Sequence, residues 1–203
     1  MSSGTLYVVA APSGTGKTTL VKALVESIPN ITVSISHTTR PKRPAEIDGV
    51  NYHFIDQNTF KDMIKQEEFL EHATVFGNLY GTSNTWVKKT LEAGNDVILE
   101  IDWQGYQQIR RLFPKCIGIF ILPPSAEALS DRLVTRNQDK PEVVKQRLAD
   151  IRETVSHIHE FDYVLVNDSF ETAVTDLKTI VLAGRLVERI QTRKYAKLIE
   201  QLA

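Results

Sequence analysis

The hydrophobic and polar positions of the chain predict strands and helices in alternation. Short apolar runs rich in β-branched residues, with no polar face, are typical of the buried strands of a parallel sheet. Five such runs cover residues 5–11, 31–36, 96–102, 116–122 and 162–166. Helical patterns separate or follow them at residues 17–28, 104–112, 125–136, 141–159 and from about 170 onward. Strand–helix alternation of this kind predicts an α/β fold with a doubly wound parallel sheet.

Two regions interrupt this alternation. Residues 37–90 contain alternating patterns such as "NYHFI" and "LEHATVFGNLYG", which favour a small mixed-β lobe. Residues 136–142, "RNQDKPE", are polar, contain a proline and lie between two helical patterns, so they favour a hinge or lid. No repeat or linker is present, and both regions are therefore interpreted as insertions within one domain. The final stretch, residues 183–203, mixes charge with an apolar stripe and is expected to pack on the core, with a partner interface as the alternative.

Composition narrows the class of protein. A chain of 203 residues with 42% hydrophobic and 24% charged residues fits one soluble globular domain. The net charge of −1 supplies no global field for nucleic acid or an acidic membrane, so neither partner is expected. No apolar stretch approaches the roughly 18 residues of a membrane span, and the start of the chain lacks a basic targeting segment, so we expect a cytoplasmic protein.

The only cysteine, Cys116, lies in the apolar run "CIGIFIL" and is predicted to be a buried strand residue. One cysteine cannot form an internal disulfide, and no Cys/His spacing suits zinc. The five histidines show no metal-binding pattern either.

The stretch "VVAAPSGTGKTTLVKAL", from Val8 to Leu24, indicates a polyphosphate-binding loop. In the pattern G-x-x-x-x-G-K-[ST], backbone N–H groups surround phosphate oxygens at a helix N-terminus. Ala11 replaces the first glycine, which is tolerable where the backbone needs no positive φ. Lys17 is expected to reach the β- and γ-phosphates, and the Thr18 hydroxyl to help hold Mg²⁺. The predicted ATP-binding residues of the loop are Ser13, Gly14, Thr15, Gly16, Lys17, Thr18 and Thr19. A Ser/Gly-rich turn without a ligand is the alternative.

A second basic segment suits another phosphate. Arg40 and Arg43 are three residues apart, and Pro41 and Pro44 favour an extended, stiff backbone between them. Two guanidinium groups on such a segment can grip one phosphate through charge-assisted hydrogen bonds, and Tyr52 can add a neutral donor. The alternative for "RPKR" alone is a solvated basic loop.

Four motifs together resemble the guanylate kinase family over essentially the whole chain. They are the phosphate loop, "SxSxTTRxxRxxExxGxxYxF", "FLEHATVFGNLYGTS" and "LEIDWQG". The resemblance implies a P-loop nucleoside monophosphate kinase that transfers a phosphoryl group from Mg²⁺-ATP to GMP, and to dGMP, by direct in-line displacement. The rival from another class is a non-catalytic guanylate-kinase-like module that binds protein partners. A kinase for another monophosphate is disfavoured by the residues expected around the base.

The resemblance assigns the nucleotide monophosphate to residues of the inserted lobe and of one strand end. It places the phosphate on Arg40, Arg43, Tyr52 and Tyr80, and the base on Ser36, Glu71, Thr82 and Glu100. Guanine chemistry agrees, because a carboxylate can accept from N1–H and N2–H₂ together, whereas adenine N1 would face it with a lone pair. Hydroxyl groups of Ser36 and Thr82 can donate to guanine O6. From the alternation in "FLEHATVF" alone, an outward-facing Glu71 is the alternative.

Other residues of the predicted site follow the later strands. Glu100 and Asp102 lie at the carboxyl end of a predicted strand, where open α/β sheets bind ligands. Asp102 is expected to hold Mg²⁺ through water or to orient a neighbour, but which carboxylate serves the base and which the metal stays open. The family often has Asp where this chain has Glu100. Asn167 and Asp168 are implied to lie near the ATP adenine.

Three lid arginines complete the predicted catalytic set with Lys17. Arg132 and Arg136 are spaced i, i+4 on one helical face, and with Arg147 they match arginines that close over the transferred group in the family. Asn137 replaces a common glycine. The predicted core covers residues 1–36, 91–131 and 148–203, the GMP-binding lobe residues 37–90, and the lid residues 132–147. The sequence leaves open whether the protein is a monomer or a homo-oligomer, and whether it prefers GMP or dGMP.

Overall fold

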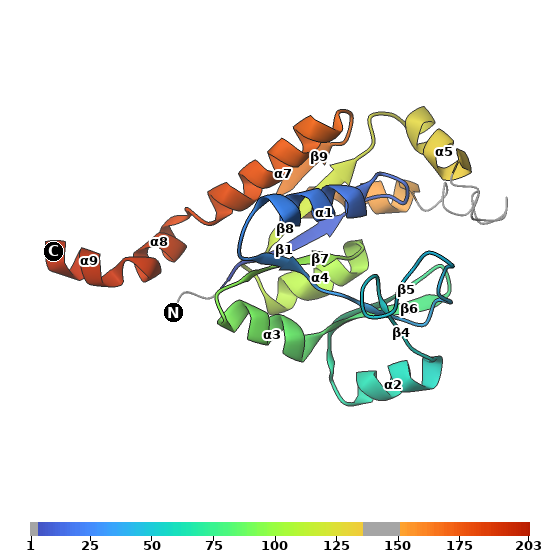
Figure 1. Cartoon of the computed structure of the whole chain (residues 1–203), viewed down its shortest axis with the longest axis horizontal. Coiled ribbons are helices and arrows are strands. Elements are labelled where there is room, and N and C mark those ends of the chain that lie inside the picture. Colours follow the sequence, from blue (N-terminus) through green and yellow to red (C-terminus); the bar gives the residue numbers. More distant parts are fainter. Residues whose placement is uncertain (1–3, 136–150) are drawn as a thin grey trace.

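A five-stranded parallel sheet forms the centre of the fold (Figure 1). The computed structural model describes residues 4–135 and 151–203. The strand order is β2-β7-β1-β8-β9, and each neighbouring pair is parallel. The strands are β1 (Leu6–Ala10), β2 (Ile31–Val33), β7 (Asp96–Glu100), β8 (Ile117–Leu122) and β9 (Tyr163–Val166). They fall within the five predicted runs, although β2 ends three residues earlier than expected. The predicted α/β fold with a parallel sheet is confirmed.

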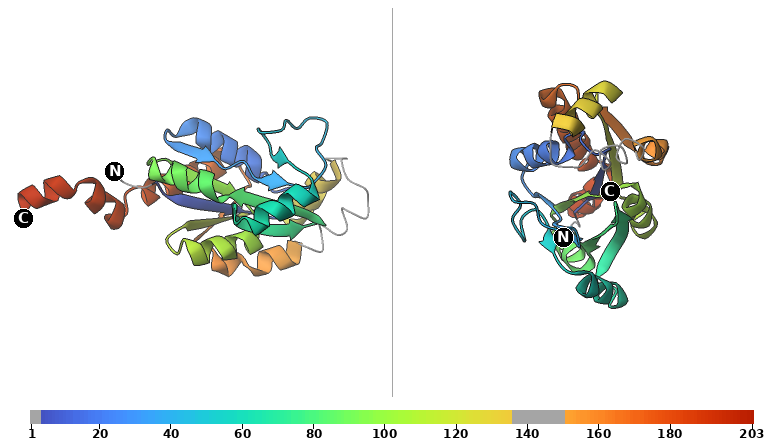
Figure 2. Two further views of the ribbon diagram at one scale, coloured as in Figure 1. Left: turned by 90° about the horizontal axis from the view of Figure 1, so that it is seen from below. Right: turned by 90° about the vertical axis from the view of Figure 1, so that its right-hand side faces the viewer.

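Helices cover both faces of this sheet (Figure 2). On one face, α1 and α7 bury leucines against β1, β7 and β8. On the other face, α3 and α4 form a second apolar cluster that includes Val87 and Ile109. The structure also has α5 after β8. The bounds are α1 (Lys17–Ser27), α3 (Asn84–Glu92), α4 (Trp103–Leu112), α5 (Ala126–Thr135) and α7 (Phe170–Gly184).

The inserted region contains a second, mixed sheet. Its strand order is β4-β3-β6-β5, with one parallel pair and two antiparallel pairs. The elements are β3 (His37–Thr38), β4 (His53–Phe54), α2 (Gln57–Lys65), β5 (Phe69–Val75) and β6 (Asn78–Ser83). The mixed sheet agrees with the alternating patterns in the sequence. Two helices in this region, α2 and α3, were not predicted. Each begins with a side-chain cap, Asp56 for α2 and Ser83 for α3.

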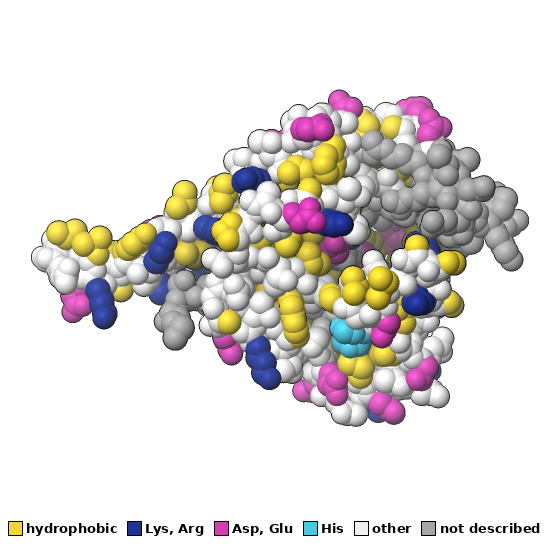
Figure 3. Space-filling model, in the orientation of Figure 1, with side chains coloured by type: hydrophobic (Ala, Val, Ile, Leu, Met, Phe, Trp, Pro, Cys, Tyr) yellow, Lys and Arg dark blue, Asp and Glu magenta, His cyan; other side chains and the backbone are white. Residues whose placement is uncertain are grey.

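The C-terminal part differs from its prediction. After α7 the chain forms two short helices, α8 (Glu188–Lys194) and α9 (Ala196–Leu202), which extend away from the sheet (Figure 1). Neither has a buried residue, and hydrophobic side chains remain visible along them (Figure 3). The expectation that this stretch packs on the core is therefore wrong for α9, and α8 meets the core only through one side of a pocket at the start of β1. An amphipathic stripe predicts that a helix can bury one face, but does not identify the surface that covers it.

Three further predictions concerned the hinge, the cysteine and the absence of a membrane span. The proposed hinge, residues 136–142, lies outside the described residues, as does most of the predicted helix 141–159. Its described part is helical to residue 156 and is followed by a short 3₁₀ helix, η1 (Ile158–Glu160). Cys116 is a free cysteine and is buried, as predicted, but it lies one residue before the start of β8 rather than within the strand. Among the described residues, no helix is both long enough and apolar enough to cross a membrane.

Candidate active site

A cleft of about 1000 Å³ lies at the carboxyl ends of β1 and β7, beside the mixed sheet. This is where open parallel sheets bind ligands. It brings together three segments that are far apart in the sequence: the phosphate loop, the inserted region and the end of β7. Predicted site residues that line it are Ser13, Gly14, Thr15, Gly16, Lys17, Thr18, Thr19, Ser36, Arg40, Arg43, Tyr52, Glu71, Tyr80, Glu100 and Asp102.

The phosphate loop follows β1 directly and leads into the first turn of α1. Gly14 and Gly16 have φ of 90° and 94°, in the left-handed region that favours glycine. Ala11 is not among the residues with positive φ, so its methyl group imposes no strain there. The Thr15 hydroxyl donates to the Pro12 carbonyl at 2.8 Å. The loop is thus closed on itself with its N–H groups at a helix N-terminus, an arrangement that suits an anion.

Asn167 supports this loop from the last strand. Its side-chain amide donates to the Thr15 carbonyl at 2.7 Å, and the residue is buried. A Cβ atom at Gly16 would lie 2.7 Å from that amide nitrogen, so the approach leaves no room for a side chain. Asn167 therefore holds the backbone of the loop. Its implied place near the ATP adenine stays a prediction, as does that of Asp168, which is exposed beside it.

Lys17 lies inside the cleft near two carboxylates. Its ammonium group donates to the Ile101 carbonyl at 3.3 Å. Burial lowers the pKa of Lys17, and the charges of Glu100 and Asp102 oppose that shift. A phosphate placed in the loop would add negative charge and favour the ammonium form.

The two carboxylates after β7 have different neighbours. Glu100 Oε2 accepts a hydrogen bond of 2.8 Å from the Thr18 hydroxyl. Asp102 is the N-cap of α4, where Oδ1 accepts from the Gly105 N–H at 3.0 Å and Oδ2 accepts from the Gln104 side chain at 3.2 Å. The Glu100 carboxylate is therefore the one directed to the phosphate loop, whereas both oxygens of Asp102 are used in the first turn of α4.

The basic segment of the inserted region is held by an acidic residue that the sequence analysis assigned no role. Glu46 Oε1 pairs with the Arg40 guanidinium at 2.6 Å, and Oε2 accepts from the Arg43 N–H at 2.8 Å. Partial burial disfavours the Glu46 charge, but these two contacts nevertheless lower its pKa. Arg40 also lies over the Tyr52 ring, 5.4 Å from the centroid. Arg40 is thus not part of a simply solvated loop.

Burial of the Tyr52 side chain raises its pKa to about 12. Its ring lies 5.9 Å from that of Tyr80, centroid to centroid. Both residues line the cleft. Because burial keeps the Tyr52 hydroxyl neutral, it remains a hydrogen-bond donor on the same side of the cleft as the arginines.

Glu71 is buried, with 3% of its surface exposed. The pairing of β5 with β6 shifts register between Phe69 and Glu71, so Leu70 and Glu71 are both buried despite being adjacent. The outward-facing alternative is therefore wrong. Oε1 accepts a hydrogen bond of 2.6 Å from the Thr82 hydroxyl. Burial raises the pKa of Glu71 to about 7, the Thr82 hydrogen bond opposes the shift, and the charge of Asp102 adds to it.

Some predicted residues cannot be placed, and one was missed. Arg136 and Arg147 lie outside the described residues, as does Asn137, and the position of the Arg132 side chain is not described. Ser34 lines the cleft with 5% exposure, and its hydroxyl has no hydrogen-bond partner among the described residues. It is the first serine of the "SxSxTTR" motif, which was the available signal. Within the described residues, no cluster of three His, Cys, Asp or Glu side chains could form a metal site by itself.

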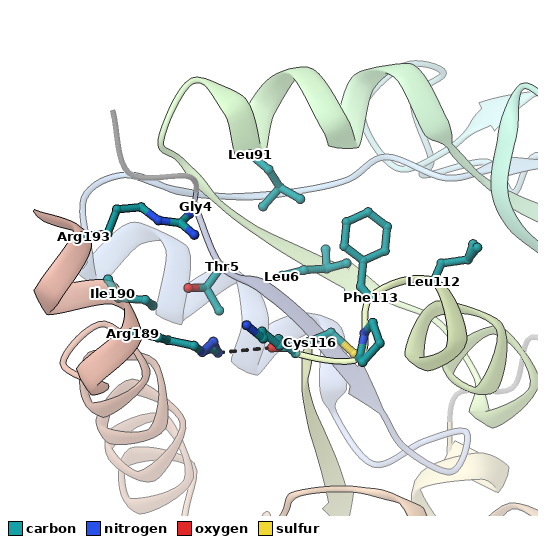
Figure 4. Close-up of a pocket in the computed structure, with 12 residues that line it drawn as sticks. Gly4, Thr5, Leu6, Leu91, Leu112, Phe113, Cys116, Arg189, Ile190 and Arg193 are labelled. Carbon is teal, nitrogen blue, oxygen red and sulfur yellow. Dashed lines mark hydrogen bonds between the residues drawn. The ribbon is translucent and has the colours of Figure 1, made fainter.

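A smaller pocket of about 360 Å³ lies at the opposite end of the sheet, at the starts of β1 and β8 (Figure 4). No residue of the predicted nucleotide site lines it. The two pockets are thus separated by the length of β1.

Comparisons with known proteins give one consistent answer. A sequence model of the family described as guanylate kinase matches residues 3–183. The chain is 52% identical over 202 residues to the guanylate kinase of Coxiella burnetii, covering 100% of this chain and 98% of that protein. It is 55% identical over 199 residues to the guanylate kinase of Alcanivorax borkumensis, covering 98% and 96%. The crystal structure of guanylate kinase from Anaplasma phagocytophilum superposes with a TM-score of 0.79 at 32% identity, covering 92% of this chain and 89% of that one.

Proposed function

The chain belongs to the guanylate kinase family, and on this basis we propose that it transfers the γ-phosphoryl group of ATP to GMP, producing ADP and GDP. The observation that supports this most directly is the buried Glu71, which lines the same cleft as the phosphate loop and is held from behind by the Thr82 hydroxyl. Burying a charged carboxylate costs free energy unless hydrogen-bond donors satisfy it. Guanine supplies two adjacent N–H donors that can do so.

Recognition of the base rests on Glu71 in its ionised form. Oε1 already accepts from Thr82, which fixes the carboxylate plane and leaves further lone pairs for guanine N1–H and N2–H₂. Because the single Thr82 proton is used in this contact, we assign Thr82 as a positioning residue for Glu71. Ser36, which lines the cleft, is left to donate to guanine O6.

The phosphate of GMP would be held by Arg40, Arg43, Tyr52 and Tyr80. Glu46 fixes Arg40 and the Arg43 backbone before the substrate arrives. A guanidinium group that is already ordered loses less conformational entropy when it binds phosphate.

Transfer requires alignment and charge neutralisation rather than a covalent intermediate. The acceptor phosphate oxygen is already anionic, so no strong general base is needed. Lys17 would exchange its 3.3 Å contact with the Ile101 carbonyl for the β- and γ-phosphate oxygens. Arg132, Arg136 and Arg147 would close over the transferred group and exclude water, which would otherwise accept the phosphoryl group.

The oxygen atoms near the loop fit Mg²⁺ carried by ATP. Mg²⁺ prefers oxygen ligands and usually binds through one or two side chains together with phosphates and water. The Thr18 hydroxyl and the Glu100 carboxylate, 2.8 Å apart, provide such oxygens, with Asp102 two residues away. When bound, the ion would neutralise part of the negative charge on the phosphate groups. A cytoplasmic location remains a prediction, as does phosphorylation of dGMP.

The test is base discrimination by the Glu71→Gln variant. The amide must direct a donor at one guanine donor, so kcat/KM for GMP should fall by roughly 10²-fold, the loss of about one to two charged hydrogen bonds. The value of kcat/KM for AMP should change little, so the ratio of kcat/KM for GMP to that for AMP should fall sharply. Glu68→Gln removes the same charge from an exposed position and is the matched control. An unchanged ratio in Glu71→Gln would mean that guanine is recognised elsewhere.

A further inference from the structure

We propose that the 360 Å³ pocket at the start of β1 binds a small anionic amphiphile, namely a carboxylate attached to an apolar body of about a dozen heavy atoms (Figure 4). This site is separate from the nucleotide cleft and goes beyond the proposed function. It is bordered by four segments and open to solvent on one side: the segments are the start of β1, the end of α3, the connection from α4 to β8, and α8.

The interior of the pocket is apolar. Leu6, Leu91 and Cys116 line it with 3–6% of their surface exposed, and all three belong to the apolar cluster under α3 and α4. Phe113 and Ile190 complete the apolar lining from the α4–β8 connection and from α8. A pocket of 360 Å³ is within the range of small-molecule sites, and at the ~30 Å³ that one water occupies in the liquid it holds about twelve groups of that size.

The charges of the pocket all have one sign. Arg189, Arg193 and Lys115 line it, and its lining contains no Asp or Glu. Across residues 4–135 and 151–203, none of these three side chains forms an ion pair with a carboxylate. The Arg189 guanidinium has only a long contact of 3.4 Å, to the Lys115 carbonyl. In a chain with a net charge of −1, three cations at one apolar pocket whose lining contains no carboxylate favour an anionic ligand.

The positions of the arginines define where the anion would lie. Arg189 and Arg193 are four residues apart on α8, and Figure 4 shows both side chains extending from that helix toward the strand. Planar guanidinium groups bind a carboxylate through paired hydrogen bonds. The headgroup would therefore lie beside α8, and the apolar body would extend over Leu6 toward Leu91 and Phe113.

Decanoate is the probe, because its ten carbons and single carboxylate match the volume and the charge. Titration by calorimetry should show one site with a Kd of roughly 0.1–1 mM, the order expected for a ligand of a dozen heavy atoms. In ¹H–¹⁵N spectra of the full chain, shifts should concentrate at Leu6, Cys116 and Ile190 and leave Gly14 and Gly16 unmoved. Decanol and decylammonium, which share the chain but lack the anion, should bind at least 10-fold more weakly.

Two variants of adjacent residues on α8 provide the matched comparison. Arg193→Gln should raise the decanoate Kd by about 10-fold or more, because a charge-assisted contact is lost. Lys194→Gln removes the same charge from a residue that does not line the pocket, and should change the Kd less than about 2-fold. Neither change should alter turnover of ATP and GMP, since no lining residue belongs to the nucleotide cleft. Any of the following overturns the proposal: no binding of decanoate at 5-fold above the expected Kd, equal binding of decanol, spectral shifts in the phosphate loop, or equal effects of the two variants.

Discussion

The Thr18 hydroxyl donates a 2.8 Å hydrogen bond to Glu100 Oε2, although the two residues are 82 positions apart in the chain. Thr18 is in the first turn of α1, and Glu100 is the last residue of β7. Asp102, two residues further on, has both carboxylate oxygens engaged at the N-terminus of α4. Of the two carboxylates, Glu100 is therefore the one that we propose as a partner of Thr18 in binding Mg²⁺.

This relationship predicts unequal effects of two neutralising substitutions. Glu100→Gln should raise the Mg²⁺ concentration for half-maximal activity by about 10-fold, because a carboxylate beside the Thr18 hydroxyl is lost. Asp102→Asn should change it much less, since asparagine is also a good helix N-cap. Mg²⁺ titrations at saturating ATP and GMP measure both. A larger effect of Asp102→Asn would assign the metal to Asp102.

Lys17→Ala should abolish most of the turnover without unfolding the protein. The ammonium group supplies charge at the transferred phosphate, and loss of one preorganised donor typically lowers kcat by about 10²- to 10³-fold. Its contact in the free protein is a single 3.3 Å bond, so little stability depends on it. An assay coupled to ADP release gives the rate, and urea unfolding gives the stability. Near-normal turnover would exclude Lys17 from the reaction.

Glu46→Gln should weaken GMP binding more than it slows transfer. The variant loses the ion pair that orders Arg40 and weakens the contact with the Arg43 N–H. We expect KM for GMP to rise about 10-fold, on the order of one charge-assisted hydrogen bond, with kcat reduced less than 3-fold. Glu26→Gln breaks an exposed pair with Lys22 and serves as the control. If kcat falls and KM stays constant, Glu46 instead supports the transition state.

The pKa of Glu71 predicts how stability and GMP affinity depend on pH. In the free protein its pKa is raised from 4.5 to about 7, so the folded state favours the protonated form. The contribution of Glu71 to the free energy of unfolding is therefore fully present below pH 4.5. It decreases by about 3 kcal/mol in total as the pH rises from 4.5 to 7. The loss should be absent in Glu71→Gln, as urea unfolding across this range can show.

The affinity for GMP should increase as the pH rises, whereas the stability decreases. The base needs ionised Glu71, so binding releases a proton below pH 7 and the Kd for GMP rises as the pH falls, by up to ~10-fold per unit. The GMP phosphate also titrates, but equally in Glu71→Gln, which isolates the carboxylate. Calorimetry between pH 5.5 and 8 measures both proteins. Parallel pH profiles would show that Glu71 does not ionise on binding.

The parallel sheet could be predicted from sequence because its strands are buried on both faces and therefore read as continuous apolar runs. The phosphate loop was equally clear, since Gly14 and Gly16 occupy left-handed backbone positions that few other residues adopt. Helices α2 and α3 were not predicted because they lie within alternating segments, and their caps, Asp56 and Ser83, are informative only once a helix is suspected.

At the candidate site, the local sequence pattern did not predict the positions of two important side chains. Alternation in "FLEHATVF" pointed Glu71 outward, but a register shift after Phe69 turns it inward, and such a shift has no period to detect. Glu46 was missed because its role depends on Arg40 and on the fold of the loop between them. The orientation of α8 and α9 could not be predicted, since their apolar positions specify a face and not a neighbour.

The central position of β1 constrains the order in which the protein can assemble during synthesis. Tyr7 pairs with Ile98 on one side and with Ile117 on the other, so β1 has no neighbouring strand until about half of the chain has been synthesised. The Thr15 carbonyl of the phosphate loop lacks its hydrogen-bond donor until Asn167 has also been synthesised. Non-local pairing of this kind slows folding and exposes strand edges in the meantime. Nascent chains shorter than about 167 residues should therefore bind no ATP, however intact their phosphate loop.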